Sequence, residues 1–173
     1  MLPSAIITVR ELILWEYAKL RTEEARGVRH NWLFNLHNFE QLNSDRKMWL
    51  RILSENTYAD MNKCAYCGAE DELSVTRIVP KKMCKFAEAH NVIRACKKCN
   101  ESKSDKDLLE WWPSEAKDSL PLNMMARYLK ILYICYECNG ALDESAFDKD
   151  GNRDISYLRK IFKKHCNQQN AKL

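Results

Sequence analysis

The sequence has little glycine and little proline, with four of each in 173 residues. Both residue types favour turns and weaken helix interiors, so their scarcity indicates a helix-rich chain. No apolar run approaches the roughly 18 residues that a membrane helix needs. The first residues, MLPSAIITVRELILW, carry Arg10 and Glu11 and have no basic segment before them. We therefore expect neither a signal peptide nor a membrane anchor, and we expect a cytoplasmic protein.

The net charge is only +4, but the positive charge is concentrated in one segment. Between residues 77 and 106, three acidic residues, Glu88, Glu101 and Asp105, stand against a larger basic set. That set is Arg77, Lys81, Lys82, Lys85, Arg94, Lys97, Lys98, Lys103 and Lys106. A local basic segment suits the phosphate backbone of a nucleic acid. The alternative is an ordinary solvated surface.

Eight cysteines are many for a cytosolic protein, in which paired cysteines indicate metal more often than disulfides. Two CxxC pairs, Cys64 with Cys67 and Cys96 with Cys99, predict a tetrahedral Zn²⁺ site with Zn–S bonds of about 2.3 Å. Four protein ligands leave no position for a catalytic water, so this zinc would be structural. The alternative is four free cysteines in the core.

A third pair, Cys135 and Cys138, has the i, i+3 spacing of a helix within an apolar pattern. We interpret these two cysteines as small apolar core residues. The alternative is a second zinc site completed by His165 and Cys166.

The N-terminal part predicts two helices. Thr8 and Glu11 have the spacing of a capping box, and Gly27 is a typical helix terminator, so the first helix should run from about residue 8 to 26. The aromatic segment 29–39 is expected to pack across it. Ser44 is predicted to cap a second helix.

The central and C-terminal parts follow a different pattern. Short strands are predicted in LSVTRIVP, residues 73–80, and NVIRAC, residues 91–96, each beside a cysteine pair. A helix should begin at Ser104 or Asp105 and end before Pro113. The segments 121–138 and 154–166 should be helical. The expected fold is α+β and mostly helical, with an N-terminal helical region (1–60), a zinc core (61–113) and a C-terminal helical region (114–173) in one compact unit.

Residues 64–112 resemble the HNH endonuclease family of the zinc-bearing ββα-metal type. The family pattern runs CxYCG, DHIVP, an asparagine, CxxCNxxK and often DLLEW. This chain has CAYCG, TRIVP, HNVIRACKKCN, ESK and DKDLLEWW in the same order. The resemblance implies a β-hairpin and a helix held together by zinc.

The resemblance also implies roles for individual residues. Arg77 stands where the family has its general-base histidine, and Thr76 stands where it has an acidic ligand of the catalytic Mg²⁺. Asn91 matches the middle asparagine that orients the loop, and Asn100 matches the third motif position, which binds the same metal. Two of these four positions therefore depart from the family's chemistry.

The departures favour binding over cleavage. Arginine has a pKa above ~12 and cannot accept a proton near neutral pH. A threonine hydroxyl is a poorer Mg²⁺ ligand than a carboxylate. The guanidinium of Arg77 is, however, well suited to hold a phosphate. His90 is the one histidine close to the motif that could replace the missing base.

Three functions follow from these residues. The first is nucleic-acid binding without hydrolysis, with double-stranded DNA as the first expectation, through Arg77, Lys81, Lys82, Lys97, Lys98 and Lys103. The second is an active endonuclease with Mg²⁺ or Mn²⁺ near Asn100 and His90 or a nearby carboxylate as base. The third is a protein-interaction module with Trp111 or Trp112 as an anchor.

Overall fold

The computed structural model describes residues 3–55, 62–83, 87–113, 119–148 and 150–153, together with 155 and 158. The fold is α+β and mostly helical, with one two-stranded antiparallel sheet in the described residues. The chain divides into two compact units. The terminal unit comprises Met1–Glu55 with Tyr136–Leu173, and the central unit comprises Asn56–Cys135. In the described residues, no helix combines the length and apolar character that crossing a membrane requires.

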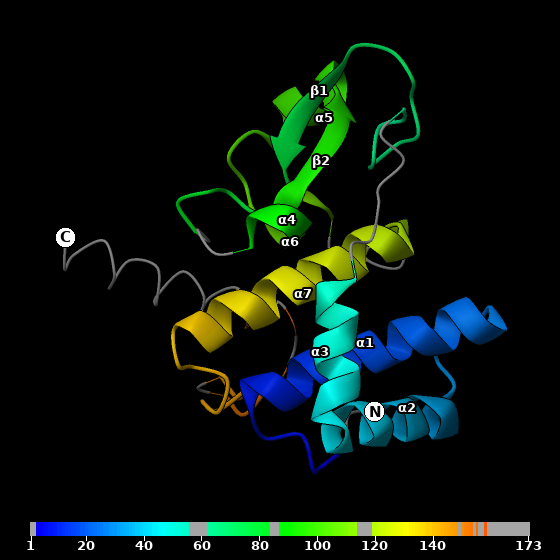
Figure 1. The fold of residues 1–173 in the computed structure, drawn as a ribbon, viewed down its shortest axis with the longest axis vertical. Coiled ribbons are helices and arrows are strands. Elements are labelled where there is room, and N and C mark those ends of the chain that lie inside the picture. The colour runs from blue at the N-terminus through cyan, green and yellow to red at the C-terminus, as the bar shows by residue number, and fades with distance from the viewer. Residues whose placement is uncertain are drawn as a thin grey trace. The chain divides into compact units, whose positions relative to one another are not determined.

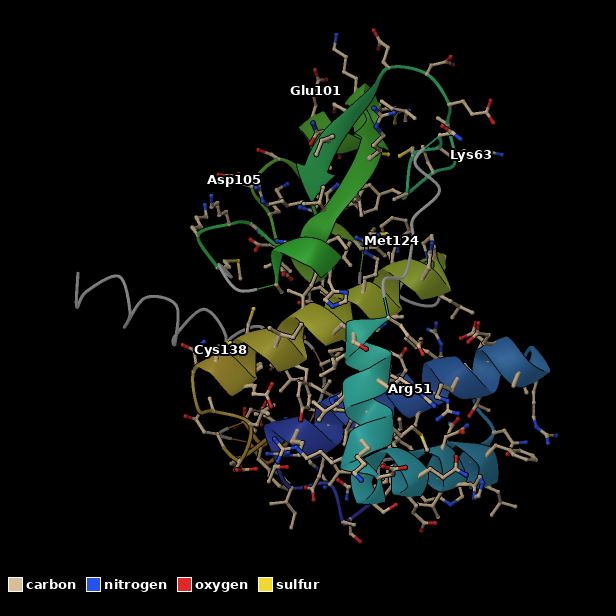
Figure 2. All side chains as sticks on the ribbon, viewed as in Figure 1. Arg51, Lys63, Glu101, Asp105, Met124 and Cys138 are labelled. Atoms are coloured by element: carbon tan, nitrogen blue, oxygen red, sulfur yellow. The ribbon has the colours of Figure 1, made fainter. Side chains whose placement is uncertain are left out.

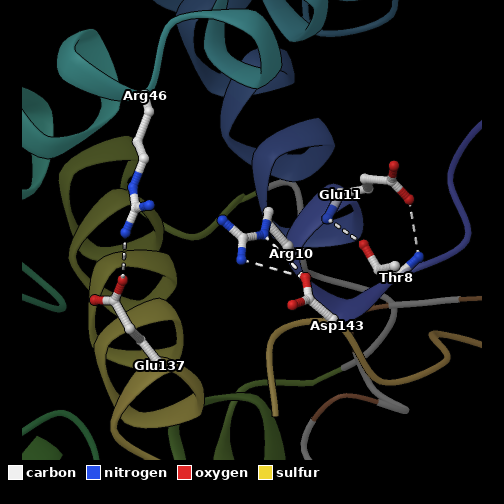
Figure 3. A network of polar contacts seen from close by, with 6 residues as sticks. All are labelled: Thr8, Arg10, Glu11, Arg46, Glu137 and Asp143. Atoms are coloured by element: carbon white, nitrogen blue, oxygen red, sulfur yellow. Dashed lines mark hydrogen bonds and ion pairs between the residues drawn. The ribbon is translucent and has the colours of Figure 1, made fainter. Parts of the chain in front are cut away.

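The terminal unit begins with helix α1, Val9–Arg26, and its capping box is confirmed. The Thr8 hydroxyl accepts a hydrogen bond from the Glu11 backbone N–H at 3.2 Å, and the Glu11 carboxylate accepts one from the Thr8 N–H at 2.9 Å (Figure 3). Each bond satisfies a backbone donor that a helix start leaves open. Gly27, at φ 71°, ends the helix in the left-handed conformation, as predicted.

Helix α2, Trp32–Ser44, lies alongside α1 (Figure 1). The ring of Trp15 meets those of Trp32 and Phe39 edge to face, at centroid distances of 5.6 and 5.9 Å. The expectation that the aromatic segment packs on the first helix is confirmed. These rings bury a large apolar area and fix how the two helices meet.

Helix α3, Arg46–Ser54, begins one residue later than predicted. Its cap is Asp45, whose carboxylate accepts a hydrogen bond from the Met48 N–H at 3.0 Å. Ser44 is the last residue of α2, and its hydroxyl donates to the Glu40 carbonyl at 2.7 Å. The prediction of Ser44 as the cap is therefore wrong, because its side chain bonds back into the preceding helix.

The end of helix α7 (Leu122–Cys138) and the segment after it contact the N-terminal part of the terminal unit through backbone bonds and ion pairs. The Val9 N–H donates to the Glu144 carbonyl at 2.9 Å, and the Ala146 N–H donates to the Ile7 carbonyl at 2.8 Å. Arg10 pairs with Asp143 at 3.2 Å, and Arg46 pairs with Glu137 at 3.9 Å (Figure 3). The backbone bonds carry more weight, because ion pairs on exposed surfaces contribute little.

The central unit contains the two predicted strands, β1 (Leu73–Arg77) and β2 (Val92–Cys96). They form the antiparallel sheet (Figure 1). Its helices are α4 (Glu88–Asn91), α5 (Lys97–Lys103), α6 (Leu108–Trp111) and α7 (Leu122–Cys138), of which the last three residues belong to the terminal unit.

The structure corrects the helix predicted from Ser104 or Asp105. Helix α5 had no counterpart in the prediction, and α6 is capped by Asp107, whose carboxylate accepts from the Leu109 N–H at 3.1 Å. Ser104, at φ 48°, lies in the break between these helices. The predicted helix over 121–138 is confirmed. The predicted helix over 154–166 lies outside the described residues except for Ile155 and Leu158.

Candidate metal centre and basic strand pair

The structure brings the two predicted cysteine pairs together. The sulfur atoms of Cys64, Cys67, Cys96 and Cys99 all lie within 4.8 Å of one another. The Cys67 and Cys96 sulfurs are 3.7 Å apart. A tetrahedral zinc with Zn–S bonds of about 2.3 Å places its sulfurs about 3.8 Å apart. This cluster could therefore hold a metal ion such as Zn²⁺.

The first cysteine pair sits in a tight turn that is tied to the sheet. The Cys64 N–H donates to the Ala69 carbonyl at 2.7 Å, and the Gly68 N–H donates to the Cys64 carbonyl at 2.9 Å. Gly68 has φ 75°, a conformation that other residues rarely adopt. The Ala65 N–H donates to the carbonyl of Arg94 in β2 at 2.9 Å. The turn is thus held against the strand that supplies Cys96.

The thiols of Cys64 and Cys99 differ in acidity. Burial by itself raises the pKa of the Cys64 thiol, but backbone hydrogen bonds with Cys96, Cys67 and Tyr66 outweigh it and lower the pKa to about 6. Burial and the neighbouring thiols raise the pKa of Cys99. Metal binding requires thiolates, so Zn²⁺ must displace the proton of Cys99 when it binds.

The register of the hairpin separates two faces. Ser74 pairs with Ala95 and Thr76 pairs with Ile93, and opposite residues share a face. Ile93 and Ala95 are fully buried, and the Asn100 side chain on α5 donates to the Ser74 hydroxyl at 3.2 Å. We call this side, which packs against α5, the covered face. The other side, which we call the open face, is formed by the pairs Leu73–Cys96, Val75–Arg94 and Arg77–Val92, and its Cys96 end is buried.

Asn91 holds the chain that leaves β1. Its side-chain N–H donates to the Val79 carbonyl at 2.8 Å, and its side-chain oxygen accepts from the Val79 N–H at 2.8 Å. The Asn91 backbone carbonyl accepts from the Ile78 N–H at 3.0 Å. Asn91 is 1% exposed, so these bonds are shielded from water. The asparagine thus orients the loop directly after Arg77.

Arg127 on α7 holds the other side of the same junction. Its Nε donates to the His90 carbonyl at 2.9 Å and its Nη2 to the Val92 carbonyl at 2.6 Å. These carbonyls flank Asn91 in the chain. Tyr128, the next residue, donates its hydroxyl to Asp107, the cap of α6, at 2.9 Å. Helix α7 therefore fixes the end of the hairpin and the start of α6.

Thr76, Arg77 and Asn91 lie at one end of the hairpin, whereas Asn100 contacts Ser74, nearer the other end. Thr76 and Arg77 are both half-buried, Thr76 on the covered face and Arg77 on the open face. Asn100 lies beside the covered face. His90, the alternative base, is 7% exposed. Its burial does not favour contact with a phosphodiester.

The basic residues divide into an exposed set and a buried exception. Lys81, Lys82, Lys97 and Lys98 are exposed, and Lys82 makes an exposed ion pair with Asp105 at 3.4 Å. Lys103 is only 2% exposed, and its ammonium donates to the Lys106 carbonyl at 2.9 Å. Burial lowers its pKa. The expectation that Lys103 contacts nucleic acid is therefore corrected, since its ammonium is buried and hydrogen-bonded within the fold.

Three residues of the site carried no specific role in the sequence analysis. Arg94 was counted only in the basic segment, although its place in the alternating pattern of a strand puts it on the face of Arg77. Arg127 is a basic residue within an apolar helix pattern. This position could have indicated a side chain that bonds to buried backbone carbonyls, as Arg127 does. Tyr66 packs its ring against Trp111 at 4.8 Å, and the Trp111 indole donates to Ser102 at 2.9 Å. These contacts support the zinc turn from α6.

The third cysteine pair does not behave as one unit. Cys135 is buried and disulfide-bonded. Cys138 is exposed with a free thiol at the end of α7 (Figure 2). The interpretation as core residues therefore fails for Cys138. The alternative second zinc site needs a Cys135 thiolate, which the disulfide removes. Its other predicted ligands, His165 and Cys166, lie outside the described residues.

In the described part of the chain, the four-cysteine cluster is the one group of histidine, cysteine or acidic residues close enough to hold a metal. Asn100 therefore has no described carboxylate cluster beside it for Mg²⁺ or Mn²⁺. Comparisons of the chain with protein-family models, with curated proteins and with solved structures find no match. The resemblance to HNH endonucleases rests on the quoted sequence motifs.

Proposed function

We propose that the central unit is a zinc-stapled ββα module, similar to that of HNH endonucleases, that binds nucleic acid without cutting it. Double-stranded DNA is the first ligand we propose. The observation that carries this proposal is the placement of Arg77. It ends β1 directly before the loop that Asn91 holds, at the position where a nuclease of this type would keep its base.

The chemistry at this position favours holding a phosphate. A guanidinium stays protonated at any physiological pH and can donate two parallel hydrogen bonds to phosphate oxygens. It cannot take a proton from water. Thr76 offers a neutral hydroxyl where a divalent cation needs a carboxylate. The positive charge of Arg77 also opposes a cation placed next to it.

The exposed lysines extend the positive surface beyond Arg77. Lys81 and Lys82 follow β1, and Lys97 and Lys98 begin α5. Two acidic residues lie near these lysines in the chain: Glu101 is on α5, and Asp105 follows α5 (Figure 2). Contacts to phosphates place a protein on nucleic acid and carry no sequence information by themselves. We therefore propose binding with little base recognition.

Fluorescence anisotropy of the zinc-loaded full chain with a labelled DNA duplex tests this function. Neutralised phosphates release counterions, so affinity should fall steeply between about 50 and 200 mM salt. Arg77→Glu should weaken binding. Arg51→Glu, at an exposed arginine on α3 (Figure 2), is the matched control and should not. Absent binding, or affinity that is flat across this salt range, would contradict the proposal.

A further inference from the structure

The open face of the hairpin carries two arginines and no acidic residue. Neither β1 nor β2 contains an aspartate or glutamate. Val75 lies in the middle of this face and is 64% exposed, so the centre of the face is in contact with solvent. Arg94 is directly opposite Val75, and Arg77 is opposite Val92. The face is therefore a small apolar surface with a positive charge on each strand.

The register makes Arg77 and Arg94 diagonal neighbours across the two strands. Such diagonal positions are about 7–8 Å apart, within reach of long side chains. Both side chains are half-buried and start from positions close enough to reach one anionic group. Each can present a planar pair of donors to a phosphate. The arrangement is thus complementary to a group with several anionic oxygens.

Both arginines sit on backbone that is held from a second side. The carbonyl of Arg94 accepts from Ala65 in the zinc turn at 2.9 Å, and Cys96 follows two residues later. Beyond Arg77, Ile78 and Val79 are bonded to Asn91. The zinc cluster therefore fixes the strand of Arg94, and Asn91 fixes the strand of Arg77. A site held in this way loses little conformational entropy when its ligand binds.

We propose that Arg77 and Arg94 form a cross-strand phosphate clamp on the open face, which takes the phosphodiester backbone of the nucleic acid. This inference rests on the proposed function and adds Arg94, the face and the mode of binding. Two fixed positive charges supply the neutralisation that a divalent cation supplies in a metal-dependent site. Binding by the clamp is therefore independent of Mg²⁺.

The test compares duplex affinity of the parent chain with Arg77→Ala, Arg94→Ala and the double variant. Each single change should weaken binding about tenfold, as the loss of a charge-assisted hydrogen bond implies. Each should also lower the slope of log affinity against log salt by about 1. Arg51→Ala, on α3, is the matched control and should change neither quantity. Adding Mg²⁺ at constant ionic strength should not increase the parent's affinity.

The two proposals fail in different ways. If the parent does not bind the duplex, the proposed function fails and the clamp fails with it. If the parent binds but Arg77→Ala and Arg94→Ala bind equally well, or if Mg²⁺ is required, the clamp alone is overturned. Zinc content reports whether each variant is folded. If an alanine variant loses zinc, the corresponding lysine variant, Arg77→Lys or Arg94→Lys, is measured in its place. A weaker duplex affinity with an unchanged salt slope supports the clamp. An unchanged affinity overturns the clamp.

Discussion

The side-chain amide of Asn91 forms two hydrogen bonds with the backbone of Val79, one to its carbonyl and one from its N–H, both at 2.8 Å. An asparagine can thus take the place of a neighbouring strand and pair a loop that leaves the sheet. Arg77 lies two residues before Val79, so the backbone that follows Arg77 is held in place by Asn91. A flexible loop would place its guanidinium less reproducibly.

Asn91→Ala should destabilise the chain, because it leaves the buried N–H and carbonyl of Val79 without their partners. Each such group costs about 1–3 kcal/mol. Urea denaturation of the zinc-loaded protein measures the loss. Asn100→Ala is the control, since it removes a bond to the exposed Ser74 hydroxyl, and should cost less. Equal losses in the two variants would show that the Val79 bonds do not stabilise the loop.

Purified protein should contain one Zn²⁺ per chain, and Cys99→Ser should abolish it. Structural zinc contributes about 10–16 kcal/mol to small domains, so this variant should also lose the fold of the central unit. Cys138→Ser is the control, because Cys138 is exposed and far along the chain from the four-cysteine cluster. Metal analysis and circular dichroism measure both effects. Zinc retained by Cys99→Ser, or lost from Cys138→Ser, would contradict the assigned ligand set.

Substituting Lys98 should change nucleic-acid binding and substituting Lys103 should not, although both residues belong to α5. Lys98→Met removes an exposed charge and should weaken duplex binding and lower its salt slope by about 1. Lys103→Met should leave both unchanged in protein that retains zinc, because the Lys103 ammonium is bonded to the Lys106 carbonyl. Anisotropy at several salt concentrations measures both variants. A clear effect of Lys103→Met on the salt slope would show that this residue reaches the ligand.

The terminal unit offers a test at alkaline pH. Burial, followed by the charge of Glu24, raises the pKa of Tyr17 from 10.0 to about 12. A group whose pKa is raised on folding contributes stability below its unfolded pKa and loses it as the pH rises. The free energy of unfolding should therefore fall more between pH 10 and 12 in the parent than in Tyr17→Phe. Parallel curves for the two proteins would mean that Tyr17 is not buried against Trp49 as the ring contact implies.

Local signals predicted the parts of the fold that depend on neighbouring residues. Short-range patterns with one favoured geometry were the most informative. They are the capping box of Thr8 and Glu11, the helix stop at Gly27 and the CxxC spacing of Cys64 and Cys67. The two strands were also recognisable, since each is short and adjoins a cysteine pair. The four-cysteine cluster could be anticipated because each CxxC pair is local and a structural zinc needs four ligands, which two such pairs supply.

Features that depend on distant contacts could not be predicted in this way. Helix α5 is polar, lacks the apolar periodicity that marks a helix, and follows β2 without an intervening residue. Lys103 is buried by residues that the fold packs around it, and only its bond to the Lys106 carbonyl is local. The clamp of Arg127 on the carbonyls of His90 and Val92 joins residues more than thirty positions apart. Spacing along the chain carries no information about such a contact.

The central claim is that this chain holds nucleic acid and does not cut it. Incubating zinc-loaded protein with supercoiled plasmid and Mg²⁺ or Mn²⁺ tests it directly, with the Thr76→Asp, Arg77→His double variant in parallel. The account predicts that the parent retards the plasmid on a gel and leaves it supercoiled once the protein is removed, while the double variant nicks it. Nicking by the parent chain would contradict the account and show that a base other than residue 77 performs the chemistry.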